Sequence, residues 1–134
     1  MNNVFSRSWK ASTSPRKQRK YRYNAPSHLR RVMLSAHLDK PLRQKYGRRS
    51  IPVRTGDTVK VVRGSFKGKQ GLIDRVSYSR MLVYVAGCER VTVKGQKVRV
   101  GIDASNVIVT VLKLNDKRRV AALERKQKIE QTRT

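Results

Sequence analysis

The chain has 134 residues, enough for one small domain with tails, and 33 Lys and Arg against 8 Asp and Glu give a net charge of +25. Self-repulsion on this scale favours a polyanion partner, nucleic acid above all. No apolar run approaches the roughly 20 residues that span a bilayer and no secretory signal is apparent, so we expect neither a membrane span nor secretion.

Basic and apolar residues follow opposite trends along the chain. Residues 1–50 contain 14 Lys and Arg and one acidic residue, a net +13, whereas residues 51–112 have a net +7 and residues 113–134 a net +5. Val, Ile and Leu concentrate in the middle. We therefore predict a basic N-terminal extension with short helices over 1–50, a β-barrel over 51–112, and a basic C-terminal helix and tail over 113–134. The flanks are expected to become ordered on a partner.

The first 25 residues are expected to be extended, because Ser14 and Pro15 interrupt any helix. A basic run with two aromatic residues lies within them, made up of Arg16, Lys17, Arg19, Lys20, Tyr21, Arg22 and Tyr23. Cations of such a run meet phosphates while its rings stack on unpaired bases, so we predict ordering on RNA. A disordered tail is the alternative. A mitochondrial transit peptide is a weaker one, because residues 1–22 lack acid but show no apolar helical face.

Two short helices are predicted next. The first covers Ser27 to Leu34 after Pro26, and the second covers Leu42 to Tyr46, with Asp39 as its N-cap and Gly47 at its end. Their candidate RNA contacts are His28, Arg30, Arg31, Lys45, Arg48 and Arg49. Cations near a helix C-terminus also complement its dipole, which accounts for part of this placement without RNA.

From Thr58 onward the apolar residues alternate with a period of two, which is typical of half-buried strands. Ile51 to Val53 is expected to lead into them as an extended segment. The pattern predicts strands near 58–63, 70–77, 80–86, 90–93 with 97–100, and 106–112, with hairpin turns at Ser77–Ser79 and Gly95–Gln96. Five short strands suit a small closed barrel, because closure removes edges. Val59 and Val61 are expected on one face of the first strand. Most of the core candidates are Ile73, Val76, Leu82, Tyr84, Val91, Val93, Val98, Val100, Ile108 and Val109.

A final helix is predicted from a cap at Asp116 to about Ile129. Val120, Leu123 and Gln127 would share a stripe on it.

The segment from Gly56 to Gly71 includes the loop between the predicted strands 58–63 and 70–77. It combines regularly spaced glycines with basic residues. Gly56, Gly64, Gly68 and Gly71 are expected to have structural roles, because glycine permits positive φ and close backbone approach. Arg63, Lys67 and Lys69 then stand on a tight turn that suits a phosphate backbone. A solvated basic hairpin is the plainer alternative.

Metal binding and catalysis find little support in the sequence. His28 and His37 are nine residues apart and Cys88 has no second thiol, so we expect no zinc site, no cofactor and no intrachain disulfide. The lone cysteine fits a reducing compartment, and we expect it in a turn. No nucleophile or phosphate-loop motif is present, so we expect no enzyme. Asp57 follows Gly56 in a turn, where its carboxylate commonly accepts hydrogen bonds from nearby backbone amides.

The stretch from Gly56 to Gly71 resembles the KOW motif of ribosomal proteins and transcription elongation factors. Residues 23–31, 42–46, 49–54, 100–102 and 112–114 extend the likeness. Together these segments resemble the large-subunit ribosomal protein twenty-four family in its eukaryotic and archaeal form, protein twenty-six in the older eukaryotic naming. The likeness covers roughly residues 16 to 128, and Gly87-Cys88 departs from the expected polar loop.

The resemblance implies a mainly β fold: a small SH3-like barrel with short N-terminal helices, a C-terminal helix and basic extended tails. It also implies binding to large-subunit rRNA near the peptide exit tunnel, early assembly, neighbouring large-subunit proteins as partners, and a place in the cytoplasmic ribosome, with nucleolar assembly in a eukaryote. No small-molecule substrate is implied.

Two other functions remain possible on the sequence. A KOW module of a transcription elongation factor would bind polymerase and nascent RNA, but such modules usually sit in longer chains. A DNA-compacting protein would explain the charge and leave the glycine pattern unexplained.

Overall fold

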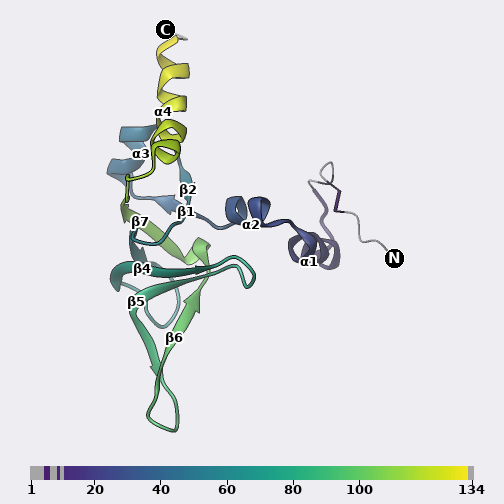
Figure 1. The fold of residues 1–134 in the computed structure, drawn as a ribbon, viewed down its shortest axis with the longest axis vertical. Coiled ribbons are helices and arrows are strands. Elements are labelled where there is room, and N and C mark those ends of the chain that lie inside the picture. Colours follow the sequence, from purple (N-terminus) through teal and green to yellow (C-terminus); the bar gives the residue numbers. More distant parts are fainter. Residues whose placement is uncertain (1–4, 7–8, 10, 133–134) are drawn as a thin grey trace.

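The computed structural model describes residues 5–6, 9 and 11–132, and the side chains of residues 126–132 are outside the description. The helices are α1 (Pro15–Asn24), α2 (Ser27–Met33), α3 (Lys40–Tyr46), the 3-10 turn η1 (Ala104–Asn106) and α4 (Lys117–Thr132). The strands are β1 (Ser35–Leu38), β2 (Ser50–Pro52), β3 (Thr58–Val61), β4 (Gln70–Ser77), β5 (Leu82–Val91), β6 (Lys97–Ile102) and β7 (Val107–Val111). The predicted mainly β fold with short N-terminal helices and a C-terminal helix is confirmed (Figure 1).

The predicted capping residues delimit α3 and begin α4, although α3 starts at Lys40, two residues before the predicted Leu42. Asp39 Oδ1 accepts a hydrogen bond from the backbone N–H of Lys40 (2.8 Å) at the start of α3. Gly47, with a φ of 58°, ends that helix in the left-handed conformation. Asp116 Oδ1 likewise accepts from the backbone N–H of Arg118 (2.9 Å) at the start of α4. The predicted place of Gln127 on the α4 stripe lies outside the described side chains.

The expectation that residues 1–25 are extended is wrong for residues 15–24, because α1 covers the whole basic run, and residues 1–4, 7–8 and 10 lie outside the described part of the chain. Pro15 occupies the first turn, where its missing N–H costs nothing and its fixed φ suits a helix. The carbonyl of Ser14 accepts from the backbone N–H of Gln18 (3.1 Å). The pair that was expected to break a helix therefore begins one.

The strands form one seven-stranded sheet in the order β2-β1-β7-β3-β4-β5-β6, so the expected closed barrel is wrong. Strands β1 and β2, beyond the five predicted, extend it past β7. Pairing is antiparallel throughout except between β1 and β7, where His37 lies beside Ile108. The open edges are protected in other ways: β2 has only three residues and ends at Pro52, and β6 has Lys97 and Arg99.

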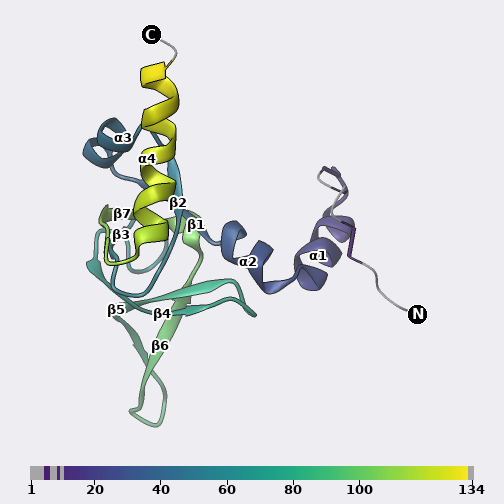
Figure 2. The same cartoon turned by 45° about the horizontal axis from the view of Figure 1, so that its top comes forward.

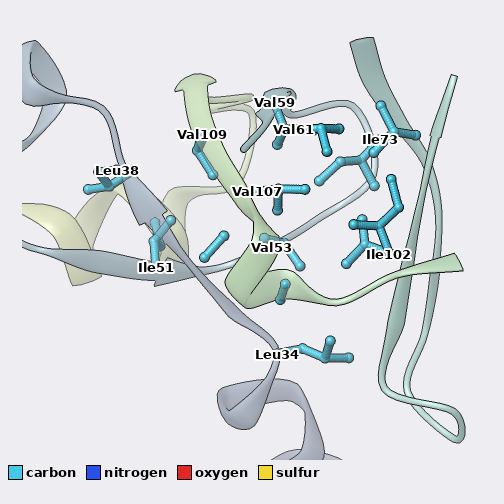
Figure 3. Close-up of a cluster of buried hydrophobic side chains, with 14 of the residues drawn as sticks. Leu34, Leu38, Ile51, Val53, Val59, Val61, Ile73, Ile102, Val107 and Val109 are labelled. Carbon is cyan, nitrogen blue, oxygen red and sulfur yellow. The ribbon is translucent and has the colours of Figure 1, made fainter. Parts of the chain in front are cut away.

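The core consists of buried side chains from the strands, from the segments beside them and from α3, η1 and α4, and part of it is drawn in Figure 3. Its largest fully buried apolar side chains come from the strands, from Leu34 before β1, from Val53 after β2 and from Leu123 of α4. Of the predicted core residues, Ile73 and Val109 are buried, and so are Val59 and Val61, which were predicted to share one face of β3. Val76, Leu82, Tyr84, Val100 and Ile108 are partly buried.

Three predicted core residues are exposed instead. Val91, Val93 and Val98 lie on the distal part of the β5–β6 hairpin, where the period of two continues but the hairpin projects away from the sheet (Figure 1). Strand β5 of this hairpin also contains Cys88. This residue was expected in a turn but is fully buried. Its burial raises the pKa of the thiol, against a smaller opposing effect of Lys69.

The face of β5 that points inward is also shifted by one residue. Val83 and Val85 are buried, whereas Leu82 and Tyr84 are only partly so. Met81 in the preceding turn has a positive φ of 57°, and the β4–β5 pairing shifts register between Ile73 and Arg75. A one-residue change of register exchanges the two faces of a strand, and local alternation does not reveal it.

Three projections depart from the sheet in different directions. Helices α1 and α2 form an arm on one side, α4 extends past α3 at one end, and the β5–β6 hairpin extends at the other (Figure 1, Figure 2). In the described part of the chain, no helix combines the length and hydrophobicity needed to cross a membrane.

Candidate nucleic-acid interface

The turn between β3 and β4, residues 62–69, presents three cations on a short, hydrogen-bonded loop. The backbone N–H of Gly68 donates to the carbonyl of Val61 (2.8 Å), and that of Val61 donates to the carbonyl of Lys69 (2.8 Å). Gly64 and Gly68 have φ values of 94° and 88°, which L-residues rarely adopt. Arg63, Lys67 and Lys69 are exposed and form no ion pair with a described acidic residue.

Phe66 anchors this turn from within. Its ring is half-buried against the core, and Lys69 Nζ lies 5.1 Å from the ring centroid. The cations are thus displayed on a loop whose centre is fixed to the domain, which favours a surface that is ordered before a partner arrives.

Gly56 and Gly71 serve the backbone in other ways. Gly56 has a φ of 88°, and a Cβ there would approach Lys113 Cδ to 2.6 Å. The φ of Gly71 is not positive, but a Cβ would lie 2.5 Å from the carbonyl oxygen of Ala86 on β5. Gly71 therefore permits close packing of β4 on β5.

Asp57 joins the sheet to α4 through a buried ion pair. It is fully buried, and its two carboxylate oxygens accept from Arg119 Nη1 and Nη2 at 2.7 Å each. The backbone N–H groups of Arg54 (2.9 Å) and Lys113 (3.0 Å) complete its hydrogen bonds. The predicted backbone bonding is confirmed.

The ion pair itself was not foreseen from the sequence. One feature of the sequence could have revealed this ion pair. Arg119 stands four residues before Leu123 and therefore lies on the same face of α4, the face that packs against the core. An Arg at such a position is buried only with a partner, and Asp57 is that partner.

A second ion pair lies beside the first. Arg54 Nη1 contacts Asp116 Oδ2. The backbone N–H of Arg118, first, and the Arg54 guanidinium, second, hold the pKa of Asp116 below its usual value. The first turn of α4 is therefore fixed to the segment before β3.

Helix α1 displays most of its predicted candidates to solvent. Arg16, Lys17, Arg19, Lys20 and Arg22 are exposed, and α1 has no buried residue. The two tyrosines differ: Tyr23 is 80% exposed, whereas the ring of Tyr21 lies 4.9 Å from that of Phe5 and 4.8 Å from that of Trp9. The cluster with Phe5 and Trp9 was not predicted.

The candidates of α2 and α3 fall into several settings. His28 and Arg31 are exposed on α2, whereas Arg30 is half-buried and its Nη2 donates to the carbonyl of Tyr23. Lys45 Nζ lies 5.4 Å from the ring centroid of Tyr46. After α3, Arg48 is half-buried and Arg49 exposed.

The structure gathers some of these side chains and separates others. His28 and Arg31 line a cavity of about 650 Å³ beside the start of α4, and Arg31 also lines one of about 430 Å³ with Arg48. Lys67 lines a different cavity, of about 480 Å³, with Lys60. Among the described residues, no group of His, Cys, Asp and Glu could hold a metal ion.

The class of protein follows from comparison with known families. Residues 12–126 match the family of ribosomal proteins described as L26 in eukaryotes and L24 in archaea, and the chain belongs to this family. It is similar to the large ribosomal subunit protein uL24 of Methanocorpusculum labreanum, with 48% identity over 114 residues, 85% of this chain and 94% of the relative. The protein of the same name from Methanoregula boonei is 47% identical over 116 residues, 87% of this chain and 96% of the relative. The family predicted from the sequence is confirmed, and it is one of ribosomal proteins rather than of enzymes.

Proposed function

We propose that this protein is a structural constituent of the large ribosomal subunit, binding large-subunit rRNA near the peptide exit tunnel and supporting subunit assembly. The names of its two relatives support the subunit. The observation that carries the RNA partner is the display of exposed cations on the 62–69 turn and on α1, within a chain of net charge +25. The site in the subunit rests on the family resemblance.

The mechanism is electrostatic and geometric. The fixed turn presents Arg63, Lys67 and Lys69 to the phosphates of an RNA junction, while α1 and the cations of α2 and α3 neutralise further phosphates. Each neutralised phosphate releases condensed counterions, so affinity falls as salt rises. In this proposal residues 1–50 form a basic extension, 51–112 the central domain and 113–134 a basic C-terminal helix and tail.

The remaining partners follow from the same proposal. Neighbouring large-subunit proteins contact the projections, and the protein works in the cytoplasmic ribosome, after nucleolar assembly in a eukaryote. It needs neither a cofactor nor a small-molecule substrate.

Binding to large-subunit rRNA fragments, measured at several salt concentrations, tests this proposal. We expect a steep negative slope of log affinity against log salt and a preference over unrelated RNA of equal length. Replacing Arg63, Lys67 and Lys69 by Gln should reduce the slope by about 2–3. The matched control replaces Arg90, Lys94 and Lys97 of the β5–β6 hairpin by Gln. It loses the same charge and should reduce the slope less.

A slope near zero, or no preference over unrelated RNA, would contradict the proposal. Gradient sedimentation separates it from the elongation-factor alternative: the protein should travel with large subunits, and travelling with polymerase instead would favour the alternative.

A further inference from the structure

The cavity of about 650 Å³ is built from four segments that are distant in sequence. These are helix α2, the segment before β3, the end of β4 with the β4–β5 turn, and the link from β7 to α4 together with the first turn of α4. Its volume lies within the range of sites that hold small organic groups. The lining residues used below are Arg31, Tyr78, Lys113, Asn115, Asp116 and Arg119.

Ion pairs fix the part of this wall that comes from α4. Arg119 is almost fully buried and is paired with Asp57, and Arg54 is paired with Asp116. These two arginines are therefore already neutralised. They give the cavity a defined shape and leave its binding chemistry to other side chains.

The other lining groups offer three kinds of contact. Arg31 and Lys113 are exposed cations whose side chains form no ion pair with a described acidic residue. Tyr78 is 37% exposed and offers an aromatic ring to a cavity that Val76 also lines. Asn115 offers an amide that can donate and accept.

We propose that this cavity holds a single unpaired nucleotide of RNA, extruded from its stack. The base lies against Tyr78, Asn115 reads its hydrogen-bonding edge, and Arg31 and Lys113 hold the flanking phosphates. Aromatic stacking combined with cationic contacts to phosphate is the usual way in which proteins bind unpaired bases. An acidic peptide would use the cations but would leave the ring and the amide without a role.

This inference rests on the proposed function and adds a base-reading element to it. None of Tyr78, Lys113 and Asn115 was a candidate on the sequence, because only the fold brings them beside Arg31.

The first test uses the full-length protein and a large-subunit rRNA fragment that it binds. Tyr78→Leu should weaken binding by about 5- to 100-fold and leave the salt slope unchanged, because it removes stacking and no charge. Tyr78→Phe should bind as the wild type does. Arg31→Gln and Lys113→Gln should each reduce the slope by about 0.7–0.9, with Lys94→Gln as the control for loss of one charge.

A second measurement needs no variant. In the wild-type complex, 4-thiouridine placed at single unpaired positions of the fragment should crosslink to the peptide that contains Tyr78 or Asn115 at one position above all others. Crosslinks spread evenly over positions, or absent from both peptides, would overturn the inference.

The two proposals fail in distinguishable ways. If the wild type does not bind the rRNA fragment selectively, the proposed function is contradicted. Selective binding by the wild type together with an unchanged affinity of Tyr78→Leu would overturn only the nucleotide site. Binding of free adenosine monophosphate as tightly as RNA, with the same dependence on Tyr78, would also overturn it by showing a small-molecule site.

Discussion

Asp57 and Arg119 are each nearly inaccessible to water, and each has the other as its counter-charge. Removing one partner leaves an uncompensated charge in the interior, which is far more costly than losing an exposed ion pair. Asp57→Asn should therefore lower the free energy of unfolding by about 3–5 kcal/mol in urea denaturation. Arg119→Met should cost a similar amount.

The double variant provides the control for this prediction. Because Asn and Met leave no buried charge, the double variant Asp57→Asn with Arg119→Met should lose clearly less free energy of unfolding than the two single variants lose together. Additive losses would show that the ion pair is not the origin of the effect.

Asp116 makes stability depend on pH. Its pKa is lowered in the folded protein, so the carboxylate contributes stability that is present above its ordinary value of 3.8 and is lost as pH falls through the lower folded value. Asp116→Asn keeps an N-cap side chain and removes the charge. In urea denaturation the wild type should exceed this variant at pH 7, and the difference should shrink by pH 3. An equal difference at both pH values would contradict the assignment.

At the level of elements, Gly71 allows β4 and β5 to pack closely. A methyl group there would lie 2.5 Å from the carbonyl oxygen of Ala86, which is backbone and cannot move aside. Gly71→Ala should therefore destabilise the protein by about 1–3 kcal/mol, seen as a lower midpoint of thermal unfolding.

Gly101 is the matched control for this prediction, because it too lies in a strand without a positive φ. Its added Cβ would meet Leu82 Cδ1 at 2.8 Å, the end of a flexible side chain. Gly101→Ala should cost less than Gly71→Ala, and the reverse order would contradict the packing argument.

Elements with local signals could be predicted from the sequence. Asp39 and Gly47 delimit α3, and β4 covers the predicted 70–77. Strands β1 and β2 could not be predicted, because they are short and β1 joins the sheet through β7, about 70 residues later. The same holds for the nucleic-acid interface: the cations were evident, but the partner of Arg119 and the neighbours of Tyr78 depend on the fold.

At the scale of the whole molecule, α1 is separate from the core. This helix buries no residue, and its five Lys and Arg repel one another at a length where isolated helices are marginal. Deleting residues 1–24 should leave the free energy of unfolding within about 0.5 kcal/mol of the wild type. The salt slope of rRNA binding should nevertheless fall by about 4 if each α1 cation meets one phosphate.

Urea denaturation and binding at several salt concentrations measure the two effects separately. An unchanged slope would remove α1 from the proposed interface. A large loss of stability would show that the arm supports the core.

The position of β7 between β1 and β3 has a consequence for biosynthesis. Until residues 107–111 have been translated, the strand pair β1–β2 and the four strands from β3 to β6 have no strand between them to join them into one sheet. Arg119, which neutralises Asp57, is translated later still. The nascent chain thus lacks a complete domain until Arg119 has been translated, and RNA that meets it earlier meets the basic N-terminal residues first.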